Sequence, residues 1–132
     1  MKTETIQQTE TFNCSTLQLY NALLNSELHS KFTQSICEIS DVVGGKYSAY
    51  DGYILGENLA FEPHTKIIQT WQAGDEDWPS NHFSTITFLL KEEGDKTVLE
   101  FTHKDIPVGL GNRYAKGWRE HYWDKMRETF SW

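Results

Sequence analysis

The chain has 132 residues, the length of one ordinary domain, and we expect residues 1–132 to form a single domain. Its 12 basic and 19 acidic side chains give a net charge of −7, which argues against nucleic acid or a membrane as partner, because both attract basic patches. Aromatic residues make up 14% of the chain, so intrinsic disorder is not expected. The charge is uneven: residues 1–112 carry a net −9, whereas residues 113–132 carry +2 and all three arginines.

The first third of the chain predicts one strand followed by two short helices. Residues 5–12 alternate in polarity with a period of two, as a strand does. Cys14-Ser15-Thr16 offers hydroxyl caps for an amphipathic helix over residues 17–24. Asn25-Ser26 repeats the capping signal and predicts a second helix that ends near Phe32.

The middle of the chain predicts an antiparallel meander, because the apolar period changes to two after residue 35. Asp51-Gly52 is typical of a two-residue hairpin turn, and Gly56 of a bulge or bend. The six predicted strands cover residues 36–41, 46–50, 53–61, 65–72, 82–91 and 97–103.

A loop over residues 104–111 precedes the longest predicted helix, residues 112–130, with Asn112 as its N-cap. Exposed tryptophans at positions 123 and 132, within this helix and just after it, are interpreted as markers of a contact. The apolar stripe itself consists of Tyr114, Trp118, Tyr122 and Met126.

This order of elements predicts an α+β fold in which a curved antiparallel sheet of six or seven strands wraps around the C-terminal helix. A gap between such a sheet and its helix is a common place for an apolar ligand. The same pattern also fits a filled core, and both readings stay open. The candidate cavity residues are Trp71, Ile86, Phe88, Leu99, Phe101, Tyr114, Trp118, Tyr122 and Met126.

No cofactor, metal site or enzymatic activity is expected from the motifs. The five histidines show neither HxxxH nor HExxH spacing, and the chain has no GxSxG, P-loop or GxGxxG motif. A general base at His121 beside Glu120 is the weaker alternative. Cys14 and Cys37 are interpreted as reduced thiols. The first eight residues are polar and do not resemble a signal peptide. Both observations favour a cytoplasmic location.

Three stretches of the chain together resemble a known family. The first consists of Gly44-Gly45-Lys46, Asp51-Gly52, Gly56-Glu57 and Ile67-Ile68-Gln69-Thr70-Trp71. The second is Trp78-Pro79-Ser80-Asn81-His82-Phe83-Ser84-Thr85-Ile86-Thr87. The third consists of Ile106-Pro107 and residues 117–122 and 125–130. In order and spacing they are similar to the C-terminal domain of the activator of heat-shock protein 90 ATPase and its bacterial stand-alone relatives. The resemblance runs from about Thr11 to Phe130 and implies the helix-grip, START-like fold.

The resemblance implies a non-enzymatic module that binds a heat-shock-protein-90-type chaperone and modulates its ATPase. The family's separate N-terminal domain, which makes the main chaperone contact, has no counterpart in these residues. The alternative is a carrier or sensor of a small apolar ligand, and the least favoured reading is an enzyme of the polyketide cyclase or hydrolase kind. The candidate partner contacts are Arg113, Lys116, Arg119, Trp78 and His82.

Two charged segments have a second interpretation besides partner contact. Arg113, Lys116 and Lys125 have the spacing of ordinary ion pairs within a helix. The acidic run 75–77 is typical of a solvated loop. Part of the charge imbalance is interpreted as complementarity between the acidic sheet and the basic helix.

Overall fold

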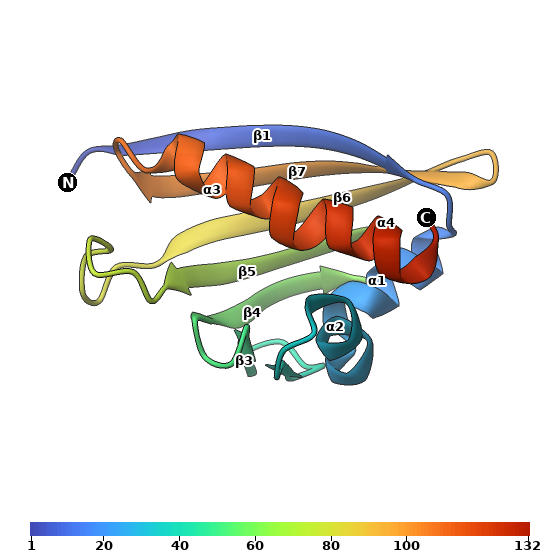
Figure 1. Ribbon diagram of the computed structural model, residues 1–132, viewed down its shortest axis with the longest axis horizontal. Helices are drawn as coiled ribbons and strands as arrows, with labels where there is room; N and C mark the ends of the chain where they lie inside the picture. Colours follow the sequence, from blue (N-terminus) through green and yellow to red (C-terminus); the bar gives the residue numbers. More distant parts are fainter.

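The computed structural model describes all 132 residues and confirms the predicted α+β architecture. One antiparallel sheet of seven strands has the order β1-β7-β6-β5-β4-β3-β2, and a long C-terminal helix lies across one of its faces (Figure 1). The strands are β1 Thr3–Phe12, β2 Glu38–Ile39, β3 Lys46–Ala49, β4 Ile54–Glu62, β5 Lys66–Ala73, β6 Ser84–Glu93 and β7 Lys96–Pro107. The helical segments are α1 Thr16–Leu24, α2 Ser26–Thr33, α3 Gly111–Trp118, η1 Arg119–Trp123 and α4 Asp124–Phe130.

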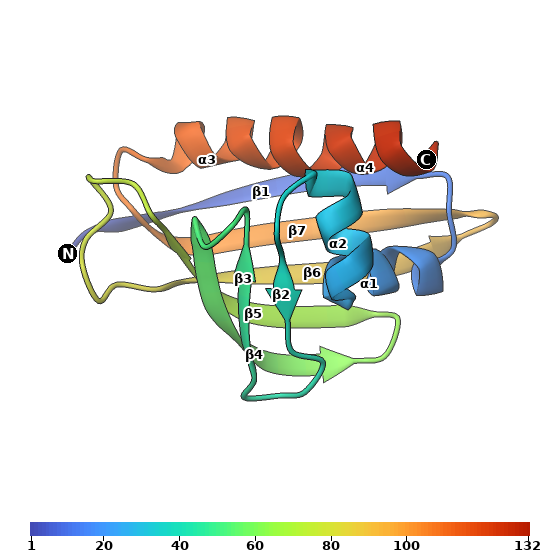
Figure 2. The same cartoon turned by 60° about the horizontal axis from the view of Figure 1, so that its bottom comes forward.

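The strands fold into this sheet because alternate side chains are apolar. In β5 every second residue from Ile67 to Ala73 is buried, and β6 repeats the pattern from Ser84 to Leu90. Successive side chains of a strand point to opposite faces, so one face of the sheet is packed and the other remains partly exposed. Figure 2 shows the C-terminal helix along one side of the sheet and α2 close to its last turns.

Segment 36–41 forms a strand over two residues only, so the predicted length was wrong. The amides on the outer edge of this segment bond to side chains of α2. The Ile39 amide donates to Ser26 Oγ at 2.8 Å, and the Cys37 amide donates to Ser30 Oγ at 3.0 Å. Helix α2 therefore covers the edge of the sheet.

The turn between β3 and β4 is longer than the two-residue turn predicted for Asp51-Gly52. Ala49 pairs with Ile54, which leaves a loop over residues 50–53. Tyr50 and Asp51 both have a left-handed φ, at 52° and 54°, and Gly52 has a φ of 87°. This run of left-handed residues begins at Tyr50, and both Tyr50 and Tyr53 lie outside the strands.

Gly56 does not form the predicted bulge. It lies opposite Tyr47 in a regular ladder, and the register shift falls instead between Asn58 and Ala60. A Cβ atom at position 56 would run into the Thr70 carbonyl oxygen and the Tyr47 ring. Gly56 is therefore required for close approach of its neighbours and not for a bend.

The start of the C-terminal helix also differs from the prediction. Strand β7 continues to Pro107 where a loop was expected from residue 104, and the helix begins at Gly111, so Asn112 is not its cap. No local side chain caps it. The Glu4 carboxylate of β1 accepts hydrogen bonds from the Gly109 and Gly111 amides at 3.1 and 2.6 Å. An anion at a helix N-terminus is favourable for the helix dipole.

A π-helical turn, η1, interrupts the C-terminal helix and changes which side chains face the sheet. Because a π turn holds one residue more than an α turn, Trp123 rotates inward to stand beside Trp118. Trp123 is completely buried, its ring stacks on Trp118 at 5.5 Å, and its Nε1 donates to Gln8 Oε1 at 2.7 Å. The prediction that Trp123 is exposed was therefore wrong.

Two buried histidines connect the helix to the rest of the core. His103 Nδ1 accepts from Trp118 Nε1 at 3.0 Å, so its Nε2 carries the proton and donates to Ser84 Oγ at 2.7 Å. His29 Nδ1 donates to the Ala22 carbonyl at 3.2 Å, and its Nε2 accepts from the Tyr122 hydroxyl at 2.9 Å. Both rings are bonded in the neutral form. Burial lowers the pKa of His29 to about 4 and that of His103 to about 3.

These pKa values predict that stability falls as the pH drops below 6.5. The unfolded chain takes up a proton on each histidine near pH 6.5, while the folded chain does not until about pH 4. Each histidine should therefore lower the free energy of unfolding by up to about 1.4 kcal/mol per pH unit between pH 6.5 and 4.5. Urea unfolding across this range measures the slope.

Replacement of His29 or His103 by glutamine should halve that slope, whatever it does to stability at pH 7. A free energy of unfolding that stays flat between pH 7 and 4.5 would show that the two rings are not held neutral.

Two glycine substitutions should have opposite effects on stability. We expect Gly56→Ala to destabilise the protein by about 3 kcal/mol, because the new methyl group meets a backbone carbonyl that cannot move freely. Gly117→Ala should stabilise it by about 0.5–1 kcal/mol, because position 117 is helical and a Cβ there meets nothing within 4 Å. Thermal and urea unfolding of the two variants test this pair, and equal effects would contradict it.

Candidate functional site

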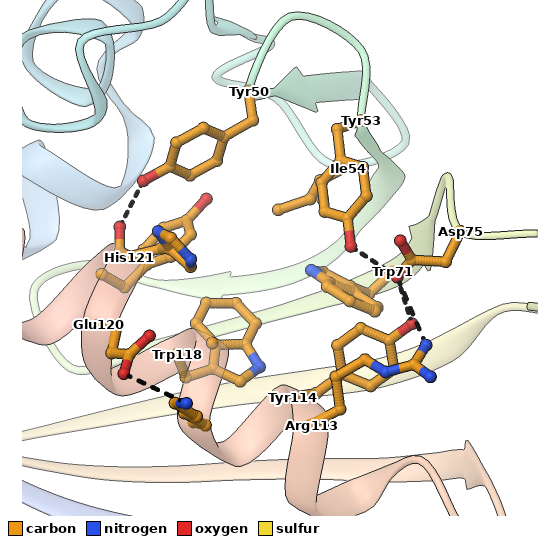
Figure 3. Close-up of a pocket in the computed structure, with 13 residues that line it drawn as sticks. Tyr50, Tyr53, Ile54, Trp71, Asp75, Arg113, Tyr114, Trp118, Glu120 and His121 are labelled. Carbon is orange, nitrogen blue, oxygen red and sulfur yellow. Dashed lines mark hydrogen bonds and ion pairs between the residues drawn. The ribbon is translucent and has the colours of Figure 1, made fainter.

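A concavity of the molecule lies between the first half of the C-terminal helix and the β3–β4 loop (Figure 3). It has a volume of about 560 Å³ and opens to solvent. This volume is within the usual range of small-molecule sites. Its lining residues are Tyr50, Tyr53, Ile54, Trp71, Asp75, Arg113, Tyr114, Lys116, Gly117, Trp118, Glu120, His121 and Tyr122.

Aromatic rings form most of the wall. Trp71 comes from β5, and Tyr114, Trp118 and Tyr122 come from the inward face of the helix, where all four are buried. Tyr50 reaches over from the left-handed loop and donates its hydroxyl proton to the His121 carbonyl at 2.6 Å. The loop and the helix are thereby joined across the pocket.

One end of the pocket is closed by Asp75. Its Oδ2 accepts hydrogen bonds from the hydroxyls of Tyr53 at 2.6 Å and Tyr114 at 2.7 Å. Arg113 binds the neighbouring Asp77 with two hydrogen bonds, at 2.8 and 2.7 Å, and this guanidinium holds the pKa of Asp77 below its usual value. Burial, followed by the bond to Asp75, raises the pKa of both tyrosines, so they remain neutral donors.

The acidic run 75–77 is therefore not merely a solvated loop. Two of its carboxylates interact with the helix, Asp77 through Arg113 and Asp75 through Tyr114. At the other end of the helix, Arg127 forms an ion pair with Glu10 of β1 at 2.8 Å. These pairs confirm that part of the charge imbalance is internal complementarity.

The remaining charges at the pocket are paired within the helix. Lys116 Nζ lies 3.8 Å from Glu120 Oε1, and both side chains are at least half exposed. Ion pairs of this kind contribute little to stability because solvent screens them. The charged groups therefore lie at the mouth, while the interior is aromatic.

The indole nitrogen of Trp71 is the one buried side-chain nitrogen or oxygen without a hydrogen-bond partner. Trp71 as a whole is only 3% exposed. A buried donor left unpaired costs about 1–3 kcal/mol. In Figure 3 this nitrogen is turned toward the space between Ile54 and Trp118.

The space directly between sheet and helix, for which the sequence left a cavity and a filled core as alternatives, is almost filled. About 10 Å³ remains there, among side chains that include Ile86 and Phe88. Of the nine cavity candidates, Trp71, Tyr114, Trp118 and Tyr122 line the larger pocket. Leu99, Phe101 and Met126 line neither space and pack in the core.

The candidate partner contacts divide into two groups. Trp78 is buried against Trp71 with its Nε1 bonded to the His82 carbonyl at 2.8 Å, and His82 Nε2 lies 2.7 Å from the Asp105 carbonyl oxygen. These two side chains hold the loop before β6. Arg113, Lys116 and Arg119 lie on the exposed side of the helix, and Arg119 makes no ion pair.

Sequence reasoning missed Tyr50, Tyr53 and Asp75 as pocket residues, because all three project from turns or loops whose shape no periodicity encodes. The two tyrosines that flank Asp51-Gly52 were the available signal. No three His, Cys, Asp or Glu side chains converge as a metal site requires. No helix combines the length and the apolar character that crossing a membrane requires.

A family model and several known proteins match most of the chain. The family model described as "Activator of Hsp90 ATPase homolog 1-like protein" matches residues 13–131. An activator of 90 kDa heat shock protein ATPase homolog from Dictyostelium discoideum is 32% identical over 131 residues, which are 98% of this chain and 34% of that protein. The human homolog 1 is 30% identical over 93% of this chain and 36% of its own length. The chain thus spans about a third of these relatives.

Two solved structures share the fold of this chain. An HSP90 activator from Plasmodium falciparum superposes with a TM-score of 0.89 at 26% identity, and the match covers 96% of each chain. The Aha1 dimer from Colwellia psychrerythraea, at 17% identity and a TM-score of 0.78, shares the fold. The family match over residues 13–131 and the similarity to the Dictyostelium protein show that the chain belongs to the family of activator of Hsp90 ATPase homolog 1-like proteins.

Proposed function

We propose that this chain is a non-enzymatic interaction module that binds a heat-shock-protein-90-type chaperone in the cytoplasm and modulates its ATPase. The observation that carries the proposal is the similarity to the Plasmodium falciparum HSP90 activator, because the match covers 96% of each chain. That solved chain is described as an HSP90 activator. The longer relatives from Dictyostelium and human support the same partner.

The exposed side of the C-terminal helix is the proposed docking surface. Arg119 is exposed and has no ion pair, and Lys116 is only weakly engaged by Glu120 at 3.8 Å. Residues outside this helix carry a net charge of −9, so these cations stand out on an acidic molecule. A localised basic surface accelerates encounter with an acidic patch on a partner more than it tightens the final complex.

The proposed function needs no chemistry from the pocket. Its charged side chains are already engaged with one another, Arg113 with Asp77 and Lys116 with Glu120. The phenol groups of Tyr53 and Tyr114 donate to Asp75. A general base or nucleophile would need a free lone pair aimed at substrate.

Binding to the purified chaperone of the same organism tests the proposal. We expect a complex by isothermal titration calorimetry that tightens when the chaperone is closed with a non-hydrolysable ATP analogue and weakens as salt rises from 50 to 300 mM. Steady-state ATPase rates with and without this chain report the modulation. Absence of a complex at 200 μM of both proteins would refute the chaperone assignment.

Reversal of one charge should slow association. We expect Arg119→Glu to lower the association rate constant about three- to tenfold at low salt, with a smaller change in the dissociation rate constant. Lys96→Glu, at the start of β7 and outside the C-terminal helix, makes the same charge change and serves as the control. Stopped-flow measurement of both variants checks this, and equal effects would show that only net charge matters.

A further inference from the structure

We infer that the free edge of strand β1 is a docking site for an extended, acidic segment of a partner protein, which adds to the sheet as a further strand. The inference rests on the docking surface proposed above in its use of Arg119, and it defines the shape and charge of what binds there. Three features of the molecule support it: an open sheet edge, unpaired backbone groups along that edge, and a free cation beside it.

The sheet has two edge strands, and only one of them is covered. At β2, serine side chains of α2 bond to the outward amides. At β1, no element lies beyond the strand on the side away from β7 (Figure 1). Native sheets usually protect an open edge with lysine, proline or a bulge. Strand β1 contains neither lysine nor proline, and its one bulge lies near its start, between Glu4 and Ile6.

The strand register shows which backbone groups of β1 face the open edge. Along an antiparallel strand, successive residues turn their N–H and C=O groups alternately to the two sides. The Thr11 carbonyl accepts from Arg127 of the helix, so Thr11 faces away from β7. Gln7 and Thr9 have the same parity and therefore also face the open edge. No backbone bond outside the regular ladders uses either residue, so the N–H and C=O groups of both are available to an added strand.

The side chains along this edge suit a strand as ligand. Gln7, Thr9 and Thr11 are exposed and uncharged, and they share the outer face of the sheet. Cross-strand pairs that include threonine stabilise a sheet. When an extended segment adds to an edge, the main-chain hydrogen bonds supply affinity and the alternating side chains supply specificity.

The C-terminal helix supplies the charge beside this edge. Gln8, on the inner face of β1, donates to the Ala115 carbonyl at 2.8 Å and accepts from Trp123 Nε1 at 2.7 Å. Arg119 follows Ala115 by one turn and its amide donates to the same carbonyl, so Arg119 lies on the β1 side of the helix. Arg119 is exposed, makes no ion pair and does not line the pocket on the other side of the helix. A carboxylate on the helix-facing side of an added strand would be its partner.

The charges favour a segment of another protein over a second copy of β1. The carboxylates of β1 are already engaged, Glu4 with the Gly111 amide and Glu10 with Arg127. They would have to leave these partners to reach Arg119 of another copy. An acidic segment with free carboxylates has no such contacts to lose.

A synthetic peptide tests the inference without any chaperone. The probe is fluorescein-labelled Ser-Val-Glu-Thr-Glu-Val-Thr, in which both glutamates lie on one face of a strand. We expect saturable binding by fluorescence anisotropy that weakens as the salt concentration rises. The same peptide with lysine in place of both glutamates should bind about tenfold more weakly, because it places cations beside Arg119.

Two N-methylated forms of the peptide separate strand addition from charge attraction. In an antiparallel strand whose glutamates face the helix, the central threonine turns its N–H toward β1 and the glutamates turn theirs away. We expect N-methylation of that threonine to weaken binding about tenfold, and N-methylation of the first glutamate to change it little. Equal effects of the two modifications would overturn strand addition.

A variant of the protein removes one donor from the edge. Because the Thr9 N–H faces away from β7, Thr9→Pro should keep the ladder and still weaken peptide binding about tenfold. Thr9→Val keeps the N–H and serves as the control, with unchanged binding expected. Arg119→Gln should reduce the advantage of the acidic peptide over the lysine peptide. If Thr9→Pro does not fold, the N-methylated peptides with the wild-type protein still decide the question.

Amide hydrogen exchange locates the peptide. We expect the Gln7 and Thr9 amides to exchange rapidly in the free protein and to become protected when the peptide is added. Protection in the free protein would show that a second copy already occupies the edge and would overturn the inference, as would no saturable binding up to about 500 μM. Binding of a chaperone but not of the peptide refutes this inference alone, whereas binding of the peptide but not of a chaperone refutes only the chaperone assignment.

Discussion

Burial of two neighbouring tryptophans from one helix against one sheet face is the constraint on which this structure depends. Trp118 and Trp123 are five positions apart, and a regular α-helix would turn the second of them away from the first. The π turn over Arg119–Trp123 brings both rings onto the sheet, stacked at 5.5 Å. Truncation of a buried tryptophan costs about 3–5 kcal/mol, which outweighs the strain of one irregular helical turn.

Much of the fold follows from local sequence signals, and some of the deviations come from contacts between distant residues. Alternation predicted the sheet, and Ser15 and Asn25 predicted both short helices, where their side chains do cap the chain. Two of the wrong predictions arose where a distant residue replaced a local signal. The cap of the last helix comes from Glu4, and the edge of the sheet is held by Ser26. Periodicity carries no information about such contacts.

The residues of the pocket likewise divide into those that the sequence predicts and those that it does not. Its helix side was predictable, because Tyr114, Trp118 and Tyr122 follow helical spacing. Its other side depends on left-handed residues at 50–52 and on Asp75, which no period encodes. Near residue 119 the helix presents Arg119 to solvent and Trp118 to the pocket, while Lys116 lines the pocket mouth. The proposed chaperone contact therefore borders the pocket and shares Lys116 with it.

The capping of the last helix by Glu4 has a consequence for synthesis of the chain. Strand β1 pairs only with β7, and its side chains also bind the C-terminal helix through Gln8 and Glu10. The strand and the helix that bind the first strand are thus translated after the other elements of this module. On the ribosome, residues 3–12 must remain an unpaired strand edge for almost the whole of elongation. Topologies of this kind fold slowly and expose edges that aggregate, so nascent chains of this module should themselves be clients of chaperones.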